Sequence, residues 1–447
     1  MNGSDGRRSR PGIEGSVAVV GSGISGLAAS WLLARSGHEV TRIEADTRPG
    51  GHSNTVDAVV DGDPVEVDTG FIVYNEHTYP NLTRLFLEAG VSTVPSNMSF
   101  AVSARGLEYS GTGLRGLFAQ PWNLFRPRFL SMLSSLVRFY RAAPTLRPAP
   151  GTTLRQLLSD GGYAPAFAED HLLPMMAAIW SADAEDVGDM EAQAFLDFFT
   201  NHGLLQFRDR PQWRTVRGGS RRYVGKLLAE PGISLELGAP VERVERRADG
   251  VRLSTAAGTR RFDDVVLATH ADRSLAMLGD ASADERRVLG AFEYAPSTAW
   301  LHTDQTFMPR RRSAWASWNY IGARDGRLCV TYWMNQLQPL GTERDVFVTL
   351  NPPREPRGVL GRFEYEHPVL NTQTAAMRRQ LWRLQGVRGT WFCGAYFGYG
   401  FHEDGLQSGL AVAEQISGRA RPWTLPNPHT RVHVTSVPRR RPARDAA

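Results

Sequence analysis

The chain has 447 residues, of which 42% are hydrophobic and 22% charged, and a formal net charge of +5, a composition typical of a folded protein of two or three domains. Its two cysteines, Cys329 and Cys393, are too few for a disulfide framework or a four-cysteine metal site. Lys226 is the one lysine, which excludes any mechanism that needs a lysine elsewhere in the chain.

Hydropathy and the two ends of the chain predict its location. No apolar run reaches the roughly 18 residues of a membrane-spanning helix, and the N-terminus lacks the apolar core of a signal peptide. We therefore expect a cytoplasmic protein. Residues 1–14 and 419–447 are rich in Gly, Pro and Arg and have no apolar periodicity, so we expect both segments to be mobile tails.

The first predicted elements form a βαβ unit, with strands over residues 16–20 and 39–43 and a helix between them. The turn after the first strand has the sequence Gly-Ser-Gly-Ile-Ser-Gly, the pattern of a dinucleotide-binding turn. Its first glycine permits a tight turn, its second lets backbone amides approach a pyrophosphate, and its third lets the helix pack on the strand. The expected cofactor contacts in this turn are Gly21, Gly23, Ser25 and Gly26.

Glu44 ends the second predicted strand, 18 residues after Gly26. A carboxylate at this position can accept hydrogen bonds from both hydroxyls of an adenosine ribose, whereas it would repel a 2′-phosphate. A second glycine pattern over residues 111–116 is expected to be a decoy, because no β-branched strand precedes it and residues 109–159 contain no acid. The first pattern therefore predicts a dinucleotide site.

The segment after Glu44, residues 45–55, has the sequence Ala-Asp-Thr-Arg-Pro-Gly-Gly-His-Ser-Asn-Thr. With the βαβ unit, it resembles the double-glycine stretch of the FAD-dependent amine oxidase and phytoene desaturase superfamily, in which His52 stands at the place of an arginine. Residues 67–71, Val-Asp-Thr-Gly-Phe, resemble the superfamily's segment beside the flavin ring. The resemblance implies cofactor contacts from Ala45, Arg48, Gly50, Gly51, His52, Gly70 and Phe71.

The resemblance returns in the second half of the chain. Residues 217–228 resemble the family's Gly-Gly segment, and three strands are predicted over residues 240–244, 250–253 and 264–269. A strand over 389–393 precedes a glycine-rich turn and a helix through Ile416, whose N-terminus the resemblance places against the flavin. Ala395 stands where relatives have the acid that holds the ribityl chain. The further implied contacts are Val241, which matches the adenine-covering position, Thr269, Gly394, Gly400, Phe401, His402 and Leu406.

These motifs predict an α/β fold, a Rossmann-like FAD-binding domain of the amine oxidase type with an inserted mixed α+β substrate domain. Residues 15–74, 215–290 and 388–418 are expected to form the FAD-binding domain. Residues 75–214 and 291–387 are expected to form the substrate domain. The resemblance implies FAD as the cofactor, and we expect it to be bound noncovalently. The histidines and methionines are too scattered to predict a metal site.

The acid-free segment 109–159 contains seven arginines and one predicted amphipathic helix. Such a helix suits an anionic membrane surface. Alternatively, it is a cap helix whose apolar stripe simply packs into the protein core. We favour peripheral membrane contact at the inner face of the membrane, because a solvated helix face usually carries both signs of charge. Nucleic acid is not expected, because the arginines accompany aliphatic residues. The expected membrane contacts are Arg126, Arg128, Arg138 and Arg141.

The second insertion is rich in aromatic residues that alternate along predicted strands. One face of these strands can line an apolar channel, or the rings can be ordinary sheet core. The aromatic residues concerned are Trp300, Trp315, Trp318, Tyr320, Tyr332 and Trp333.

Residues 394–405, Gly-Ala-Tyr-Phe-Gly-Tyr-Gly-Phe-His-Glu-Asp-Gly, closely match a motif of bacterial NAD/FAD-binding proteins that are associated with cyclopropane-synthase-like lipid methyltransferases. One branch resembles the methyl-branched fatty acyl desaturase of furan fatty acid synthesis. The likeness implies a FAD-dependent desaturase of a phospholipid acyl chain, with a lipid methyltransferase as a possible partner. His402 and Glu403 are the candidate catalytic residues. Two alternatives stay open: an amine oxidase acting on a small amine, and a non-catalytic flavoprotein that binds a lipid methyltransferase.

Overall fold

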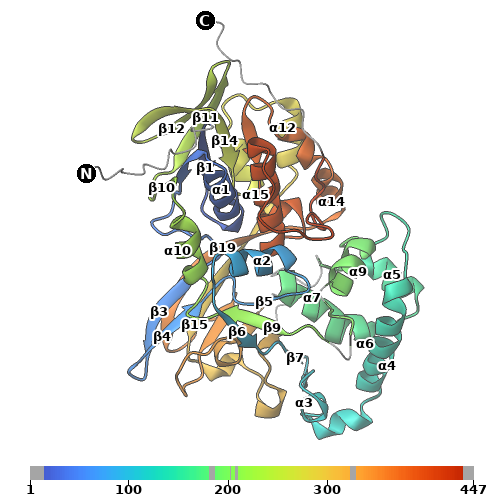
Figure 1. Cartoon of the computed structure of the whole chain (residues 1–447). Helices are drawn as coiled ribbons and strands as arrows, with labels where there is room; N and C mark the ends of the chain where they lie inside the picture. The colour runs from blue at the N-terminus through green and yellow to red at the C-terminus, as the bar shows by residue number, and fades with distance from the viewer. Residues whose placement is uncertain (1–14, 181–186, 202, 207–209, 323–328, 436–447) are drawn as a thin grey trace, which may run out of the picture.

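The structure is a computed structural model that describes residues 15–180, 187–201, 203–206, 210–322 and 329–435. The expected tail 1–14 and the end of the second tail, residues 436–447, lie outside the described residues. Figure 1 shows the nucleotide-binding sheet in the upper part of the molecule, a second sheet below it, and a group of helices to the lower right.

The nucleotide-binding part is built on a five-stranded sheet in which every neighbouring pair is parallel. The central strands are buried and rich in β-branched residues, as a parallel sheet covered on both faces requires, whereas the edge strand over residues 233–236 is partly exposed. Across the sheet they are β10 (Ile233–Glu236), β2 (Glu39–Ile43), β1 (Ser16–Val20), β14 (Asp264–Leu267) and β20 (Thr390–Phe392).

Helices α1 (Ile24–Arg35) and α15 (His402–Ser417) pack against each other beside this sheet. They can approach closely because Gly409 has no side chain. A Cβ added at this position would lie 2.1 Å from the Ser25 carbonyl oxygen. The predicted strands 16–20 and 39–43 and the helix through Ile416 are confirmed to within a residue or two. In such a sheet a ligand is expected at the carboxyl ends of the strands. Because the strands are parallel, these ends all lie at one edge in β1, β2, β14 and β20.

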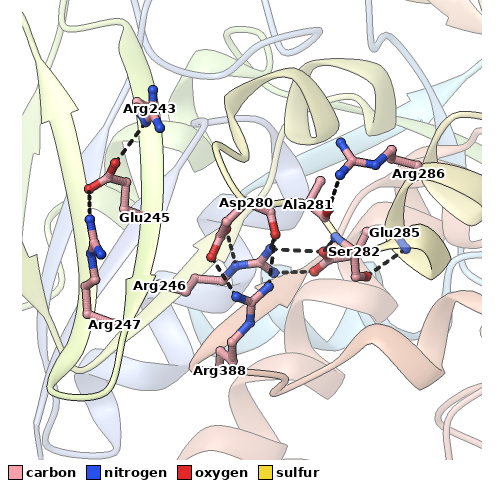
Figure 2. A network of polar contacts seen from close by, with 10 residues as sticks. All are labelled: Arg243, Glu245, Arg246, Arg247, Asp280, Ala281, Ser282, Glu285, Arg286 and Arg388. Atoms are coloured by element: carbon pink, nitrogen blue, oxygen red, sulfur yellow. Dashed lines mark hydrogen bonds and ion pairs between the residues drawn. The ribbon is translucent and has the colours of Figure 1, made fainter.

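A three-stranded antiparallel sheet, β11 (Val241–Arg247), β12 (Gly250–Thr255) and β13 (Gly258–Phe262), stands beside the parallel sheet. Figure 2 shows how Arg246 joins it to helix α12 (Ala283–Leu289). The Arg246 side chain is fully buried and donates to Asp280 over 2.8 Å and to Glu285 over 3.0 Å. Arg388, just before β20, donates to the same Asp280 over 2.6 Å. The two arginines therefore join β11, the segment from Asp280 to Glu285 and the start of β20.

The second sheet has seven strands and is antiparallel except for one parallel pair, β16 (Trp318–Ile321) with β7 (Phe100–Ala104). Two small sheets also lie below the nucleotide-binding part in Figure 1. They are the hairpin of β3 (Thr55–Val60) with β4 (Asp63–Asp68), and the sheet of β5 (Tyr74–Asn75), β9 (Trp213–Val216) and β6 (Thr93–Ser96). In order, the seven strands are β19 (Val359–Pro368), β15 (Tyr294–His302), β18 (Phe347–Leu350), β17 (Val330–Trp333), β16 (Trp318–Ile321), β7 (Phe100–Ala104) and β8 (Leu107–Ser110).

The helices of the inserted part gather at one side of this sheet (Figure 1). They share a core of buried aromatic and aliphatic residues that include Phe139, Phe167 and Phe195. They are α3 (Leu114–Leu117), the 3-10 turn η1 (Pro121–Phe125), α4 (Pro127–Ala142), α5 (Leu154–Asp160), α6 (Pro165–Phe167), the π-helical turn η3 (Ala168–Leu172), α7 (Leu173–Trp180) and α9 (Ala192–Asn201). Shorter helices elsewhere are α2 (Pro80–Glu88), α10 (Arg221–Leu228), α11 (Ala271–Met277), α13 (Met334–Leu337) and α14 (Thr372–Arg378).

The hydrophobic clusters divide the chain differently from the predicted boundaries in two places. The hairpin β3–β4 packs its valines with the seven-stranded sheet. Helix α2 packs Leu82, Leu85 and Phe86 with the nucleotide-binding core. Trp315 also differs from the prediction, because it follows a 3-10 turn rather than lying in a strand.

Residues 419–435 correct the prediction of a mobile tail. Arg421 is 5% exposed and Arg431 is 8% exposed. Arg421 donates to Glu414 over 2.7 Å and to Asn81 over 2.7 Å, and Arg431 donates to Asp404 over 3.4 Å. The composition of this segment predicts disorder, but its arginines find buried partners on α2 and α15.

Candidate functional site

A cavity of about 1520 Å³ runs from the start of α1 into the inserted part of the chain. It is larger than the roughly 300–1,000 Å³ that is typical of a ligand pocket, so it has room for a cofactor and a second ligand. Thirteen of the nineteen predicted cofactor contacts line it: Gly21, Gly23, Ser25, Glu44, Gly51, His52, Gly70, Phe71, Thr269, Gly394, Gly400, Phe401 and His402. The other six, Gly26, Ala45, Arg48, Gly50, Val241 and Leu406, do not line it.

The N-terminus of α1 opens into the cavity without a side-chain cap. Gly23 is the N-cap residue, and no side chain accepts a hydrogen bond from the first turn at this position. A Cβ on Gly23 would meet no atom within 4 Å, whereas a Cβ on Gly26 would lie 2.2 Å from the Gly21 carbonyl oxygen. The open space over free backbone N–H groups fits a phosphate anion, as the glycine pattern predicts.

The Glu44 carboxylate is held in place at the end of β2. Its Oε2 accepts from the Ser22 amide over 2.7 Å and from the Ser22 hydroxyl over 2.6 Å, and its Oε1 accepts from the Asp46 amide over 2.9 Å. Each carboxylate oxygen can accept more than one hydrogen bond. Glu44 therefore fits the predicted ribose contact.

Arg48 supplies a positive charge with an unused donor. Its Nη1 is buried and has no hydrogen-bond partner among the described residues, and its Nε lies 3.6 Å from Asp46. Its charge contributes to lowering the pKa of His52, so it lies near the cavity wall although it does not line the cavity. A buried donor without a partner is unfavourable, which fits a cofactor phosphate as its acceptor.

Four more of the predicted cofactor contacts do not line the cavity. The Gly50 amide donates to the Ser22 hydroxyl over 3.0 Å, which orients the serine that holds Glu44. Leu406 is fully buried in the nucleotide-binding core, and Val241, which begins β11, packs against the same core. Ala45 is exposed beside Glu44. Val241 therefore does not reach the cavity in this structure, and the contact with adenine stays a prediction.

His402 begins α15 and stacks on Phe71, with ring centroids 3.8 Å apart and 9° between the planes. Its Nε2 lies 2.6 Å from the Tyr223 hydroxyl and 3.4 Å from the Ser53 hydroxyl. Burial lowers the pKa of His402 to about 3. A neutral imidazole whose protonated form is so unfavourable is a weak general base, so the geometry supports positioning rather than proton uptake.

Glu403 does not line the cavity, which corrects its predicted catalytic role. Its carboxylate accepts from the Asn81 amide and from the Leu82 amide, each over 3.0 Å. These are N–H groups of the first turn of α2, which have no acceptor within their own helix. Gln407 donates to the same carboxylate over 3.0 Å. Glu403 therefore caps α2, a role that depends on a segment 322 residues away in sequence.

Sequence reasoning missed a histidine–carboxylate pair on the cavity wall. Glu44 and Glu366 are the acids that line the described part of the cavity. Glu366 Oε2 lies 3.2 Å from His270 Nδ1, and the His270 ring stacks on Tyr294 with centroids 4.0 Å apart. Burial lowers the pKa of His270, and the charge of Glu366 opposes this effect. His270 directly follows the Ala268-Thr269 turn after β14, which is the signal that could have identified it.

A second missed cluster lies in the inserted part. His171, in the π-helical turn, lies 2.8 Å from the Tyr109 hydroxyl through Nδ1 and 3.2 Å from the Tyr140 hydroxyl through Nε2. All three residues line the cavity. The Tyr109 hydroxyl also donates to the Asp170 carbonyl over 2.9 Å. Burial lowers the pKa of His171 to about 4, so the cluster is neutral near pH 7.

Two of the six aromatic residues predicted for a channel line the cavity. Trp318 and Tyr332 line it, and the Trp318 indole N–H is buried without a partner among the described residues. Trp300, Trp315, Tyr320 and Trp333 do not line it. The second glycine pattern follows β8 and ends in the single turn α3, and its Gly111 and Gly113 line the outer part of the cavity.

The family model described as flavin containing amine oxidoreductase matches residues 24–417. The chain therefore belongs to this family, whose members use a flavin cofactor.

Its relatives include a candidate flavin-containing monoamine oxidase of Mycobacterium tuberculosis, 28% identical over 56% of this chain and 56% of the relative. A hydroxyneurosporene desaturase of Cereibacter sphaeroides is 27% identical over 69% of this chain and 64% of the relative. The alignments thus span less than two thirds of either relative.

Solved structures share the fold over most of the chain. Cyclohexylamine oxidase from Brevibacterium oxydans has a TM-score of 0.65 at 17% identity, covering 90% of this chain and 99% of that one. The CLA-producing fatty acid isomerase from P. acnes has a TM-score of 0.64 at 14% identity, covering 91% and 97%. These likenesses show the amine oxidase-type α/β fold that the sequence predicts.

Two further findings concern membranes and metals. None of the helices in the described ranges combines the length and apolar character needed to cross a bilayer. In the same ranges, no group of three or more His, Cys, Asp or Glu side chains is placed to hold a metal ion.

Proposed function

We propose that the protein is a FAD-dependent oxidoreductase that desaturates an acyl chain of a membrane phospholipid, with FAD bound noncovalently. The observation that carries the proposal is the apolar face of α4. Leu133, Leu136, Val137 and Tyr140 follow the spacing of one helix face, and all four line the cavity. An apolar wall of this kind suits a hydrocarbon chain better than a small polar amine.

The cofactor would occupy the end of the cavity formed by the α1 N-terminus and Glu44, with Arg48 behind the wall. When bound, FAD would supply an acceptor for a hydride from the substrate. Desaturation also releases a proton from the neighbouring carbon. His402 is weakly basic, and among the histidines that line the described cavity wall His270 is the one paired with a carboxylate, Glu366, which favours this pair for proton uptake. His402 would instead hold Phe71 and Tyr223 in position.

The alternatives rest on weaker observations. Glu366 could neutralise the ammonium group of a small amine, but it already lies 3.5 Å from Arg273 and 3.2 Å from His270. A non-catalytic flavoprotein that binds a lipid methyltransferase requires no substrate in the cavity. That alternative does not account for the apolar part of the cavity beyond the cofactor end, which has room for a second ligand.

The test is anaerobic mixing of the purified holoenzyme with phospholipids of different acyl chains in detergent, followed by the visible absorbance of the flavin. Loss of absorbance with a lipid, and formation of a new double bond detected by mass spectrometry, supports the proposal. Hydrogen peroxide formed from amines under air identifies an amine oxidase instead. If neither lipids nor amines reduce the flavin, the non-catalytic alternative is favoured. Release of the flavin into the supernatant on denaturation tests the noncovalent attachment.

A further inference from the structure

Large apolar side chains are exposed in one short segment of the inserted part. Among the described residues, eleven large hydrophobic side chains are exposed, and five of them lie between residues 114 and 130. We call these five residues the apolar patch: Leu114 (76% exposed), Trp122 (45%), Leu124 (48%), Phe125 (83%) and Leu130 (45%). They belong to α3, η1 and α4, at the end of the molecule away from the nucleotide-binding sheet (Figure 1).

The exposure of the patch is built into the fold. In the η1 turn, Asn123 is fully buried, and its amide donates to the Gln120 carbonyl over 3.0 Å. The Gln120 side chain is also buried, and it accepts from the Glu108 amide over 3.1 Å and donates to the Gly106 carbonyl over 3.2 Å. These polar anchors face inward, so the rings of Trp122 and Phe125 face outward.

The patch is continuous with the mouth of the cavity. Leu114 belongs to the patch and also lines the cavity. Its neighbours Gly113 and Leu117, which are not part of the patch, line the cavity as well. Leu130 lies one turn before Leu133 on α4, which lines the cavity as well. Exposed apolar side chains of the patch therefore adjoin apolar side chains that line the cavity.

The charges around the patch are positive. Arg115 is exposed, and Arg126 donates to the Gly106 carbonyl and to side-chain amides rather than to an acid. The Arg311 guanidinium lies 4.6 Å above the Trp122 ring. The nearby acid Glu108 is buried and accepts from the Arg310 amide over 2.9 Å.

The predicted membrane arginines have different surroundings. Arg128 donates to Asp170 and to Glu169, each over 2.7 Å, and so its charge is compensated. Arg138 donates to the Gly161 carbonyl over 3.2 Å and lies 4.2 Å above the Tyr163 ring. Arg141 is exposed one turn further from the patch. The structure therefore moves the candidate contact from the arginines of α4 to the apolar patch and the cations beside it.

We propose that the apolar patch inserts into the surface of an anionic phospholipid bilayer and holds the cavity mouth against it. Aromatic and leucine side chains beside arginines are the combination that binds such an interface. Docking in this position lets an acyl chain pass from the bilayer into the cavity without crossing water. This inference rests on the proposed function for its substrate, but the docking itself is measured separately.

The experiment is sedimentation of the FAD-loaded protein with vesicles of phosphatidylcholine, with and without phosphatidylglycerol. We compare the wild type with Leu124→Ser/Phe125→Ser and with a control variant, Val59→Ser/Leu87→Ser. The control residues are 65% and 68% exposed but lie outside the patch, so both double variants remove similar exposed apolar area. We expect at least tenfold weaker binding to anionic vesicles for the patch variant and less than a twofold change for the control. Flavin content verifies the fold of each variant.

Three results overturn the docking proposal: wild-type protein that does not bind anionic vesicles, a patch variant that binds like wild type, or a wild-type dimer in the absence of lipid that the patch substitutions dissociate. The last result assigns the patch to a second copy of the chain. Lipid presented in detergent separates docking from catalysis. If vesicle binding is lost in the patch variant but no lipid reduces the wild-type flavin, docking holds and the proposed substrate is wrong.

Discussion

His402 and Phe71 stack face to face across the cavity wall, although 331 positions separate them in the chain; the ring centroids are 3.8 Å apart. Phe71 follows the β3–β4 hairpin, and His402 is the first residue of α15. Through this pair, the start of the helix that faces the cofactor end is joined to the segment beside it. The same contact explains the low pKa of His402, since an aromatic neighbour on one face removes water from the imidazole.

The first prediction contrasts two glycines of the nucleotide-binding turn. Gly23→Ala should leave the fold unchanged, because its Cβ would meet nothing in the protein, but it should weaken FAD binding at least tenfold by filling the phosphate space. Gly26→Ala should instead lower the melting temperature of the flavin-free protein, because its Cβ would lie 2.2 Å from a carbonyl oxygen. Calorimetry of the flavin-free proteins and flavin titration measure both effects. Equal FAD affinity in Gly23→Ala and wild type would contradict the assignment.

The second prediction concerns the unused donor of Arg48. Arg48→Met should stabilise the flavin-free protein slightly, by up to about 1 kcal/mol, because a buried donor without a partner is removed. The same substitution should weaken FAD binding, because the phosphate loses its cation. Denaturant unfolding and flavin titration test the two parts. Arg84→Met, at an exposed arginine of α2, serves as the control.

A third prediction addresses the proton acceptor. Glu366→Gln should lower the pKa of His270 further, because the carboxylate opposes the effect of burial on this imidazole. NMR titration of the His270 ring measures this change without a substrate. Flavin reduction by the substrate should slow at least tenfold, with flavin content unchanged. The assignment is wrong if the variant reduces its flavin at the wild-type rate.

The fourth prediction is the pH dependence of stability. Burial lowers the pKa of His171 from its ordinary value of 6.5 to about 4, so between these pH values the unfolded chain binds a proton and the folded chain does not. The contribution of this histidine to the free energy of unfolding is thus complete above about pH 6.5 and falls by on the order of 3 kcal/mol as the pH drops to about 4. His171→Gln should flatten this part of the curve. The exposed His77 provides the control, His77→Gln, whose curve should follow that of wild type.

The fifth prediction concerns the buried cation of Figure 2. Arg246→Leu should cost about 3–5 kcal/mol of unfolding free energy, because it leaves Glu285 buried without its ion-pair partner. Arg243→Ala removes an exposed ion pair to Glu245 on the same strand and should cost less than about 1 kcal/mol. Denaturant unfolding of the two variants compares them directly. Similar losses in both would show that burial does not decide the strength of these pairs.

The nucleotide-binding part could be predicted because its elements depend on residues that are close together in sequence. The turn from Gly21 to Gly26, the strands around it and Glu44 all depend on neighbours within about one βαβ unit. The strand β13 was missed, because four of its five residues are exposed and give no apolar pattern.

The role of a side chain could not be predicted where its partner lies far away in the sequence. Glu403 is adjacent to His402 in sequence, but Asn81 and Leu82 turn its carboxylate away from the cavity. Arg128 lies in an acid-free segment, yet Asp170 reaches it from 42 residues further along the chain. Trp318 and Trp315 belong to one aromatic stretch, and only the packing of the seven-stranded sheet decides that Trp318 lines the cavity.

The segment after α15, residues 418–435, holds the cofactor end in place from outside; we call this contact the clasp. Arg431 reaches both the Thr78 carbonyl before α2 and the Asp404 carboxylate in the first turn of α15. Asp404 in turn accepts from the amides of Tyr399 and Phe401, so the clasp fixes the loop that precedes the helix. Removing the residues after 418 would therefore unfasten the loop that leads into His402, far from the cut in sequence but one contact away in space. A shortened chain that is to keep the shape of the cofactor end must therefore retain Arg421 and Arg431.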